Sequence, residues 1–448
     1  MTAEVRTVRT EAETAIVDAH ERVRGSLPGG ASVQKHRNAA FEIFRKVGLP
    51  HRRIEEWKYT DLRALMRKVA PPAARPTIEA ARKAISELPD PLAGLDRYKL
   101  VLVDGFFFDE LSDRDALGDA GVEVEAVANL LAMDGEKAIG VLDSGKLAGR
   151  DIAVALNAAF ATDGVGILVR EGVVLDRPVE IQHVAAGAGA VTVRNTITIS
   201  DGASLRIAET HRGPSGAPYQ TNILTRIEAG AKTTVGYARL QAEGDRAVHI
   251  GTTVLTLAAP AEFKHLSVTA GSAVSRSQIF LTTGGERTKV GLFAANMIGG
   301  KQHADSTLLI DHALPGANTR VLYKSVVDGD ANGVFQGKII VEPDAQKTDA
   351  KMMSQALLVS ETASFSAKPE LEIFADDVQC GHGATAGQID EIQMFYLLAR
   401  GIPRAEAEQL LIEAFLDDAI DALGDDALGE ALKRTVSAWL EQRGARAA

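Results

Sequence analysis

Two side chains near the C-terminal end of the sequence could share one metal site. Cys380 is the only cysteine among the 448 residues, and His382 follows it by two positions. Thiolate and imidazole groups are ligands that iron and zinc accept readily. In an extended segment, residues i and i+2 point to the same side, with Cα atoms about 6.6 Å apart. One cysteine cannot hold an iron–sulfur cluster or a structural zinc, so either the pair is structural or another chain completes the site.

The residues around this pair indicate a tight, polar segment at the end of a strand. Gly381 and Gly383 remove bulk on either side of the histidine, and Asp376 and Asp377 place negative charge just upstream. A lone cysteine, however, is most often a small buried hydrophobe. The metal-binding and the structural interpretation of the pair therefore both stay open at the level of the residues.

Other histidines are weaker candidates. His303, Asp305 and His312 lie in one segment, but an odd spacing along a strand places the two histidines on opposite faces. We interpret this group as structural. The remaining histidines of the central region are scattered, and we interpret them as ordinary: His183, His211, His249 and His265.

Composition and missing motifs exclude several classes of function. A net charge of -11 argues against a nucleic-acid-binding protein. The sequence contains no G-x-x-x-x-G-K-[ST] loop, so we expect no ATP hydrolysis by this chain. It also has no signal-peptide core and no apolar run of membrane-spanning length, and we expect a cytoplasmic protein without membrane contact. Carboxylate pairs for glycoside chemistry stay an alternative, although aromatic residues make up only 5%.

The chain divides into three regions that differ in their sequence pattern. Residues 1–95 have the apolar spacing of helices, residues 96–387 are glycine-rich and alternate like strands, and residues 388–448 are helical again. Residues 71–76, PPAARP, resemble a linker. Residues 152–160 form a helical interruption early in the strand-rich region.

A faint repeat in the central region predicts a solenoid. The segment from Ile199 to Leu205 resembles the segment from Ile227 to Thr233, with Gly202 and Gly230 standing 28 positions apart. Strand–turn–strand units that return every 20–30 residues are typical of solenoids, in which each coil buries its apolar face on its neighbour. A β-sandwich is the alternative architecture.

The C-terminal region predicts three helices. An apolar stripe around Ile392 and Phe395 ends at Gly401, a second helix begins at Pro403, and a third spans Leu428 to Leu440. Acidic residues line the second helix, and the region is small. It either binds a partner or packs against the β domain of its own chain.

Three stretches of the sequence resemble the SufB/SufD family, the scaffold proteins of the SUF iron–sulfur assembly system. They are HADSTLLIDHALPGANTRVLYKSVVDGDANGVFQGKIIVEPDAQKTDAK, AKPELEIFADDVQCGHGATAGQIDEIQMFYLLARGI and, near the N-terminus, RRIEEWKYTDL. The single cysteine and the last of these stretches resemble the SufD branch, because SufB chains carry several cysteines. The resemblance implies a mainly β fold, with a right-handed parallel β-helix core between helical N-terminal and C-terminal regions.

The resemblance also implies a function. The chain is expected to be a non-catalytic scaffold that pairs with a SufB-like chain and binds a SufC-like ABC ATPase through its C-terminal helices. His382 corresponds to the family histidine at the SufB–SufD interface, and Cys380 to its neighbouring cysteine. A transient iron–sulfur cluster would form there, with none held permanently by this chain alone. A β-helix enzyme acting on polysaccharide and a homodimer of the isolated chain remain the alternatives.

Overall fold

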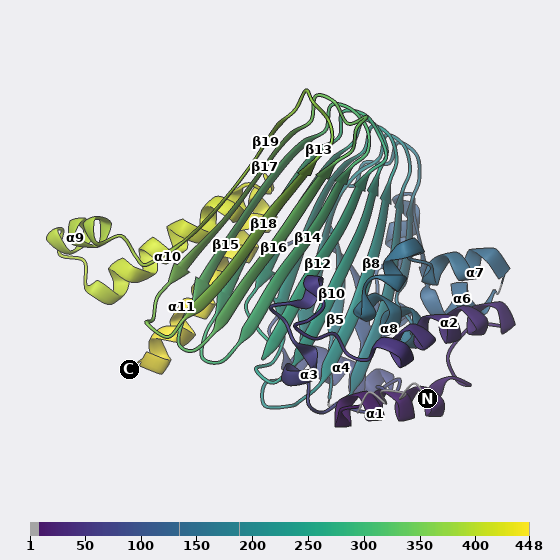
Figure 1. Cartoon of the computed structure of the whole chain (residues 1–448). Helices are drawn as coiled ribbons and strands as arrows, with labels where there is room; N and C mark the ends of the chain where they lie inside the picture. Colours follow the sequence, from purple (N-terminus) through teal and green to yellow (C-terminus); the bar gives the residue numbers. More distant parts are fainter. Residues whose placement is uncertain (1–8, 134, 188, 448) are drawn as a thin grey trace, which may run out of the picture.

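The computed structural model describes residues 9–133, 135–187 and 189–447. Its core is a parallel β-solenoid built from two sheets that face each other, as Figure 1 shows. The chain alternates between the sheets, so that each coil adds one strand to each of them. The expected mainly β fold with a parallel solenoid core between helical regions is confirmed. The expectations that concern residues 1–8 and 448 lie outside the described residues.

One sheet has the strand order β19-β17-β15-β13-β11-β9-β7-β5-β1-β2. Its strands are β1 (Tyr98–Val103), β2 (Phe106–Phe107), β5 (Val179–Val184), β7 (Ser204–Arg212), β9 (Thr234–Ala242), β11 (Glu262–Thr269), β13 (Lys289–Ile298), β15 (Asn318–Val327), β17 (Asp349–Leu358) and β19 (Gln379–Gly387).

The other sheet has the order β18-β16-β14-β12-β10-β8-β6-β4-β3. Its strands are β3 (Val122–Ala126), β4 (Val165–Val169), β6 (Ala190–Ile199), β8 (Gln220–Ala229), β10 (Val248–Leu257), β12 (Val274–Thr283), β14 (His303–His312), β16 (Asn332–Val341) and β18 (Ser364–Ile373).

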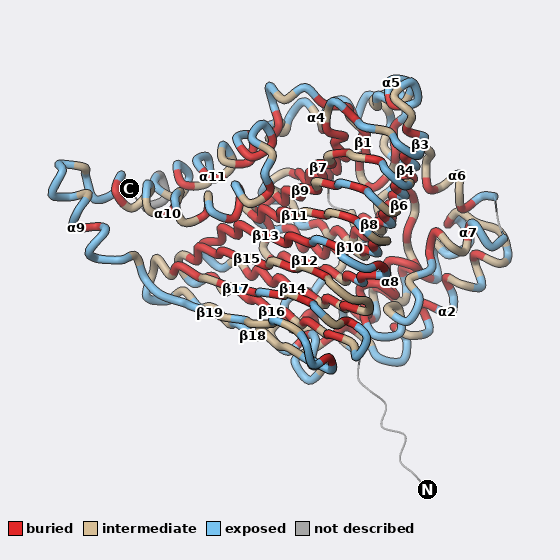
Figure 2. The backbone as a smooth tube through the Cα atoms, turned by 90° about the horizontal axis from the view of Figure 1, so that it is seen from above, coloured by how far each residue is buried: buried red, intermediate tan, exposed pale blue. Residues whose placement is uncertain are grey.

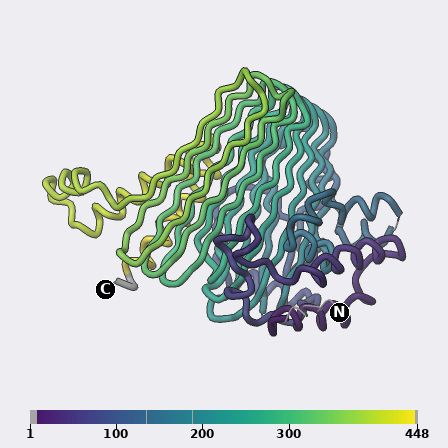
Figure 3. The backbone as a smooth tube through the Cα atoms, viewed as in Figure 1, coloured from purple at the N-terminus to yellow at the C-terminus, as the bar shows by residue number. Residues whose placement is uncertain are grey.

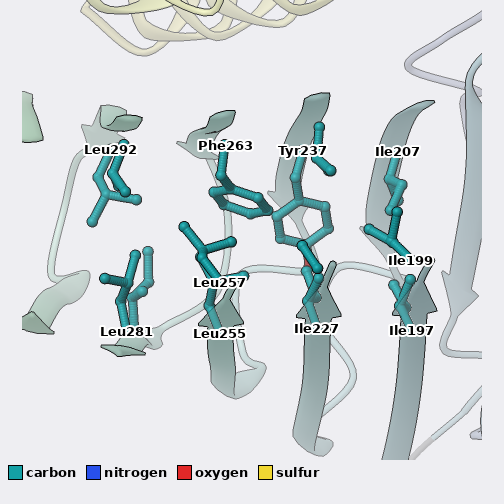
Figure 4. Packing of buried hydrophobic residues seen from close by; sticks show 14 of the residues in the cluster. Ile197, Ile199, Ile207, Ile227, Tyr237, Leu255, Leu257, Phe263, Leu281 and Leu292 are labelled. Carbon is teal, nitrogen blue, oxygen red and sulfur yellow. The ribbon is translucent and has the colours of Figure 1, made fainter. Parts of the chain in front are cut away.

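The space between the sheets is filled by alternate side chains of both. Figure 4 shows part of this packing, in which Ile227 and Leu255 of one sheet face Tyr237 and Phe263 of the other. When both faces of a parallel sheet are covered, its strands are buried over most of their length. Figure 2 shows the same pattern as a nearly continuous buried core along the solenoid.

The register corrects the repeat expected from the sequence. Ile199 pairs with Ala229, so neighbouring coils are offset there by 30 residues and not by the 28 that align Gly202 with Gly230. Gly202 instead occupies the same corner as Lys232, and both have a positive φ. A slip of two residues keeps every side chain on its own face, and for this reason the apolar pattern cannot distinguish the two alignments.

Short helices cover the first coils. Figure 3 shows the purple N-terminal helices gathered at one end of the solenoid. They are α1 (Glu11–Val23), α2 (Ala31–Val47), α3 (Leu62–Leu65), α4 (Ile78–Glu87), α5 (Arg114–Asp119), α6 (Val127–Ala132), α7 (Gly135–Leu142) and α8 (Ile152–Phe160), with 3-10 turns at Glu55–Trp57, Asp109–Leu111 and Gly145–Gly149. The helix expected at 152–160 is α8. The strand pair β3–β4 is antiparallel, and so is β1–β2, which closes both sheets at this end.

Residues 71–76 are not a free linker, contrary to the interpretation of their proline content. The Ala73 N–H donates to the Ala190 carbonyl at 2.9 Å, and the Ala190 N–H donates to the Pro71 carbonyl at 2.8 Å. The segment therefore continues the ladder beside β6. Its prolines are compatible with this because they occupy an edge, where not every N–H is needed.

Two of the three C-terminal helices pack on the solenoid. They are α10 (Arg404–Asp421) and α11 (Asp426–Ala447), whose apolar residues Leu416 and Val436 cover the outer face of the first sheet around Leu266. The remaining helix, α9 (Glu391–Ala399), stands away from the solenoid at the left of Figure 1. Of the two alternatives for this region, docking on the chain's own β domain thus applies to α10 and α11 but not to α9. None of the described helices combines the length and the apolar character needed to cross a membrane.

Candidate functional site

Cys380 and His382 lie on β19, the last strand of its sheet. In the register, Cys380 is next to Ala350 and His382 is next to Met352, both of β17. Ala350 and Met352 are buried in the core between the sheets. Because paired residues of parallel strands point to the same side, both candidate side chains face the interior of the solenoid at its final coil. The expected extended backbone that aims the two side chains to one side is therefore present.

The final coil leaves this pair accessible. Cys380 is partly exposed, His382 is exposed, and so are most of the residues that follow them on β19. In the part of the chain that the structure describes, β19 has no strand on its outer side, and neither does β18. Figure 2 shows this last coil in tan and pale blue beside the buried strands. The imidazole of His382 has no hydrogen-bond or ion-pair partner among the described residues.

The thiol of Cys380 packs against the apolar core from its edge. Burial raises the pKa of this thiol, and the Asp349 carboxylate adds to the effect, while the Ala350 backbone opposes it. The free chain therefore holds a protonated thiol at neutral pH. A metal ion or a positively charged group would be needed to make it a thiolate ligand.

The acidic residues before β19 belong to a turn and not to the pair. Asp377 forms an exposed ion pair with Lys347, and its N–H donates to the Gln346 side chain at 2.9 Å. Gly381 has open space where a Cβ would stand, whereas a Cβ at Gly383 would meet the end of the Met353 side chain at 2.8 Å. Met353 is flexible and exposed, so a Cβ at Gly383 would displace this side chain and leave the backbone in place.

The segment from His303 to His312 is structural. The hydroxyl of Thr60 lies 2.9 Å from Nε2 of His303 and donates to Asp305, which also pairs with Arg276. His312 is at the other end of β14 and faces inward, where Thr319 contacts its Nε2 at 3.1 Å. The two histidines therefore serve opposite faces, as their odd spacing indicates.

The same contacts explain the segment RRIEEWKYTDL. Its Trp57 ring is stacked 3.8 Å from the Arg276 guanidinium, and the indole N–H donates to Asp151 at 3.2 Å. Thr60 reaches Asp305 from the same segment. This motif fixes the N-terminal helices to the outer face of the second sheet, and the structure gives it no contact with the pair on β19.

The four histidines expected to be ordinary are not scattered in space. The rings of His183 and His211 are stacked 4.7 Å apart, and the His249 ring lies 4.9 Å from that of His211. Glu209 lies between the first two. His265 contacts the neighbouring Tyr237. The spacing of 28 residues between His183 and His211 was the available signal, because one coil of the solenoid brings them to adjacent strands.

Among the described residues, the one group of three or more histidine, cysteine or acidic side chains close enough to share an ion is His183, Glu209 and His211. No third ligand from the described residues thus joins Cys380 and His382. The pair on β19 is half of a site at most. Five strands of the same sheet separate it from β7, which is roughly 29 Å at the usual strand spacing.

Helix α9 presents a second exposed surface. Its side chains Ile392, Phe395 and Tyr396 are 79%, 72% and 56% exposed. The Asp390 side chain caps the start of the helix, and Gly401 with a positive φ ends it. Contiguous exposed apolar residues are typical of protein–protein contact surfaces.

Comparison with known proteins gives two adjoining matches. Residues 182–415 match the model described as "SUF system FeS cluster assembly, SufBD core domain". Residues 27–181 match the model of the SufBD protein N-terminal region. The two models thus meet just after the start of β5, within the strand-rich region.

Several curated relatives cover nearly the whole chain. An iron–sulfur cluster assembly SufBD family protein of Synechocystis is 30% identical over 414 residues, which is 90% of each chain. The iron–sulfur cluster assembly protein SufD of Escherichia coli is 30% identical over 403 residues, covering 89% of this chain and 90% of the relative. The protein of the same name from Bacillus subtilis is 38% identical over 124 residues, or 28% of each chain.

Proposed function

Because the chain belongs to the SufBD family of the SUF iron–sulfur cluster assembly system and is SufD-like, we propose that it acts as one of two paired scaffold chains. A SufB-like chain would meet it at the last coil of the solenoid. The nascent cluster, as cargo, would be bound between His382, Cys380 and ligands of that partner. The chain itself would be non-catalytic, and family membership favours this role over polysaccharide processing.

The observation that carries this proposal is the incomplete ligand pair at an open sheet edge. An edge strand presents unpaired N–H and C=O groups, which a strand of another chain can satisfy by extending the sheet. This strand addition would also bring ligands of the partner chain beside His382. An exposed edge is costly to keep unless a partner covers it, and a cluster that must be handed on needs a ligand set that can open.

The two ligands would have different roles. The imidazole of His382 has no hydrogen-bond or ion-pair partner among the described residues. It can therefore bind a metal without first losing such a contact. The Cys380 thiol has a raised pKa and must lose its proton on binding. We therefore assign His382 as the principal ligand and Cys380 as the auxiliary one.

Helix α9 is the proposed contact for a SufC-like ATPase. Its apolar residues Ile392 and Phe395 are exposed, whereas the apolar faces of α10 and α11 are already used against the solenoid. ATP hydrolysis in the bound subunits would then move the scaffold chains relative to each other through this helix. Such motion supplies a way to open the interface for iron and sulfur.

The test is the substitution His382→Ala. We expect the complex of scaffold pair and ATPase to assemble normally, while cluster formation with iron and sulfide falls by at least about tenfold, since a ligand is lost. The measurements are size-exclusion chromatography of the complex and visible absorption of the reconstituted cluster. His36→Ala, on α2 far from β19, is the matched control. Cluster formation at the unaltered rate would contradict the proposal.

A further inference from the structure

A second ligand cluster lies inside the solenoid, where the proposed scaffold function makes no use of it. His183 on β5, Glu209 on β7 and His211 on β7 place three ligand atoms within 4.8 Å of one another. All three residues are buried, with exposed fractions of 6%, 1% and 1%. Buried charged groups are normally paired or coordinate metals.

The geometry around Glu209 is that of an oriented ligand. Its Oε2 accepts hydrogen bonds from the hydroxyls of Tyr237 and Thr225, the latter at 2.9 Å. Its Oε1 is left facing the two imidazoles, 3.3 Å from Nε2 of His183 and 3.2 Å from Nε2 of His211. Ligand atoms at about 2.0 Å from a tetrahedral ion stand about 3.3 Å apart, which matches both separations.

The ring nitrogens of His211 lack hydrogen bonds that would compete with a metal ion. Neither of its ring nitrogens has a hydrogen-bond partner of good geometry among the described residues, and Nδ1 of His183 has none either. Buried polar atoms without partners are uncommon in folded proteins and call for an explanation. A bound ion would supply one for Nε2 of His211, which faces Glu209. Nε2 of His183 faces Glu209 too, and it lies 3.4 Å from the side-chain nitrogen of Asn195, which would have to give way to the ion.

The donor types also suit a cation. The cluster offers two imidazoles, from His183 and His211, and one carboxylate, from Glu209. This donor set is one that zinc and ferrous ions use.

We propose that His183, Glu209 and His211 bind one divalent transition-metal ion of the zinc or ferrous class inside the solenoid. The hydroxyls of Tyr237 and Thr225 orient the carboxylate, as groups behind metal ligands commonly do. The rings of His183 and His211 are within 9° of parallel, so binding of a shared ion would require them to tilt toward it. The site differs from the one on β19 in place and in donors, because it contains no sulfur.

Further ligand-type side chains lie between the cluster and a pocket of the molecule. A pocket of about 730 Å³ between the C-terminal half of α11 and the solenoid is lined in part by Glu243. This carboxylate lies 2.6 Å from Nδ1 of His249, whose ring in turn lies against that of His211. Nε2 of His249 has no hydrogen-bond partner among the described residues. Ligand-type side chains thus connect the pocket to the cluster.

The experiment measures metal in the full-length chain. Zinc and iron are determined in the protein purified without chelator, and again, together with visible absorption, after dialysis against cobalt(II). We expect about one equivalent of metal per chain, bound through nitrogen and oxygen without sulfur, as X-ray absorption at the metal edge would report. A chain that holds no metal in either preparation overturns the proposal.

Variants separate this site from the pair on β19. Glu209→Gln preserves volume and His211→Ala removes a ligand, and each should weaken cobalt binding by at least about tenfold. The double variant Cys380→Ala, His382→Ala and the buried control His312→Asn should bind as the wild type does. Circular dichroism verifies the β content of each. Unchanged binding in the folded Glu209→Gln variant, or loss of binding in the β19 variant, overturns the assignment.

Discussion

At the scale of single residues, the thiol of Cys380 is held in its less reactive form. Burial raises the pKa of this thiol, so the folded chain contains less thiolate at neutral pH than an unfolded chain would. Only the thiolate attacks alkylating reagents or binds metals. The cysteine is therefore protected until a partner or a metal ion lowers the energy of its charged form.

This protection predicts a specific labelling behaviour. At pH 7.5, iodoacetamide should label Cys380 in the folded chain more slowly than in the urea-unfolded chain. The rate should rise about tenfold per pH unit up to the raised pKa, because the thiolate fraction does. Mass spectrometry measures it without ambiguity, since there is one cysteine. Faster labelling in the folded chain would contradict the raised pKa and favour an activated thiolate.

Buried His312 predicts part of the acid sensitivity of the fold. Burial lowers the pKa of His312 to about 4, from an ordinary 6.5. Between these values the unfolded chain binds a proton that the folded chain does not. The contribution of His312 therefore lowers the free energy of unfolding as the pH falls from about 6.5 to about 4, by up to about 1.4 kcal/mol per pH unit.

The variant His312→Asn removes this contribution. Between pH 7.5 and pH 4.5, the free energy of unfolding should fall by less in the variant than in the wild type. Urea-unfolding midpoints at pH 7.5, 6.5, 5.5 and 4.5 measure the difference, and carboxyl groups that titrate in the same range are common to both proteins. Parallel pH curves for the two chains would show that His312 is protonated equally in both states.

At the residue scale, one of the two candidate sites could be predicted from the sequence and the other could not. The i, i+2 placement of Cys380 and His382 depends only on an extended backbone, so it could be predicted and is present. The cluster of His183, Glu209 and His211 depends on which strand lies beside which. That register is set by packing over some 30 residues, and a pattern of alternating residues does not define it.

At the scale of elements, the C-terminal helices separate into a packed pair and an exposed one. The sequence predicted three helices, because apolar spacing, Pro403 and Gly401 mark them, but it left open whether they pack inward or bind a partner. The structure answers this question separately for each helix. Leu416 and Val436 are buried against the sheet, whereas Ile392 and Phe395 on α9 are exposed.

This division decides how the ATPase contact should be tested. Deleting the chain after Ile389 would remove α10 and α11 as well and expose the apolar sheet face around Leu266. The double substitution Ile392→Ser, Phe395→Ser changes α9 alone. It should weaken binding of a SufC-like ATPase at least about tenfold, because exposed apolar anchors dominate such contacts, and leave the melting temperature unchanged.

Isothermal titration calorimetry with the purified ATPase measures this change. Val174→Ser is the control, since Val174 is equally exposed but lies in the loop before β5. Full binding by the α9 variant would place the contact on α10, α11 or the solenoid instead.

At the scale of the whole molecule, the solenoid is closed at one end and open at the other. The antiparallel pairs β1–β2 and β3–β4 and the N-terminal helices cover the first coils. Beyond β18 and β19 the described chain adds no further coil, and Ile373 and Phe374 are exposed there. Solenoids need such ends to be capped, so an open one indicates a binding surface.

The open end and α9 should therefore be separable interfaces. Phe374→Asp places a charge where apolar contact is expected, and a charge buried without a partner is strongly unfavourable. Pairing with a SufB-like chain should weaken at least about tenfold, whereas binding of the ATPase should be unchanged. The α9 variant should show the reverse pattern, so each serves as the control for the other.

Light scattering after size-exclusion chromatography distinguishes the possible assemblies. If the isolated chain self-associates through the same edge, Phe374→Asp should also convert that dimer to a monomer, because both partners would use β18 and β19. A dimer that survives the substitution would use another surface. Loss of both the scaffold partner and the ATPase from a folded Phe374→Asp variant would show that the two contacts are coupled, and the division of the molecule into two independent binding ends would then be wrong.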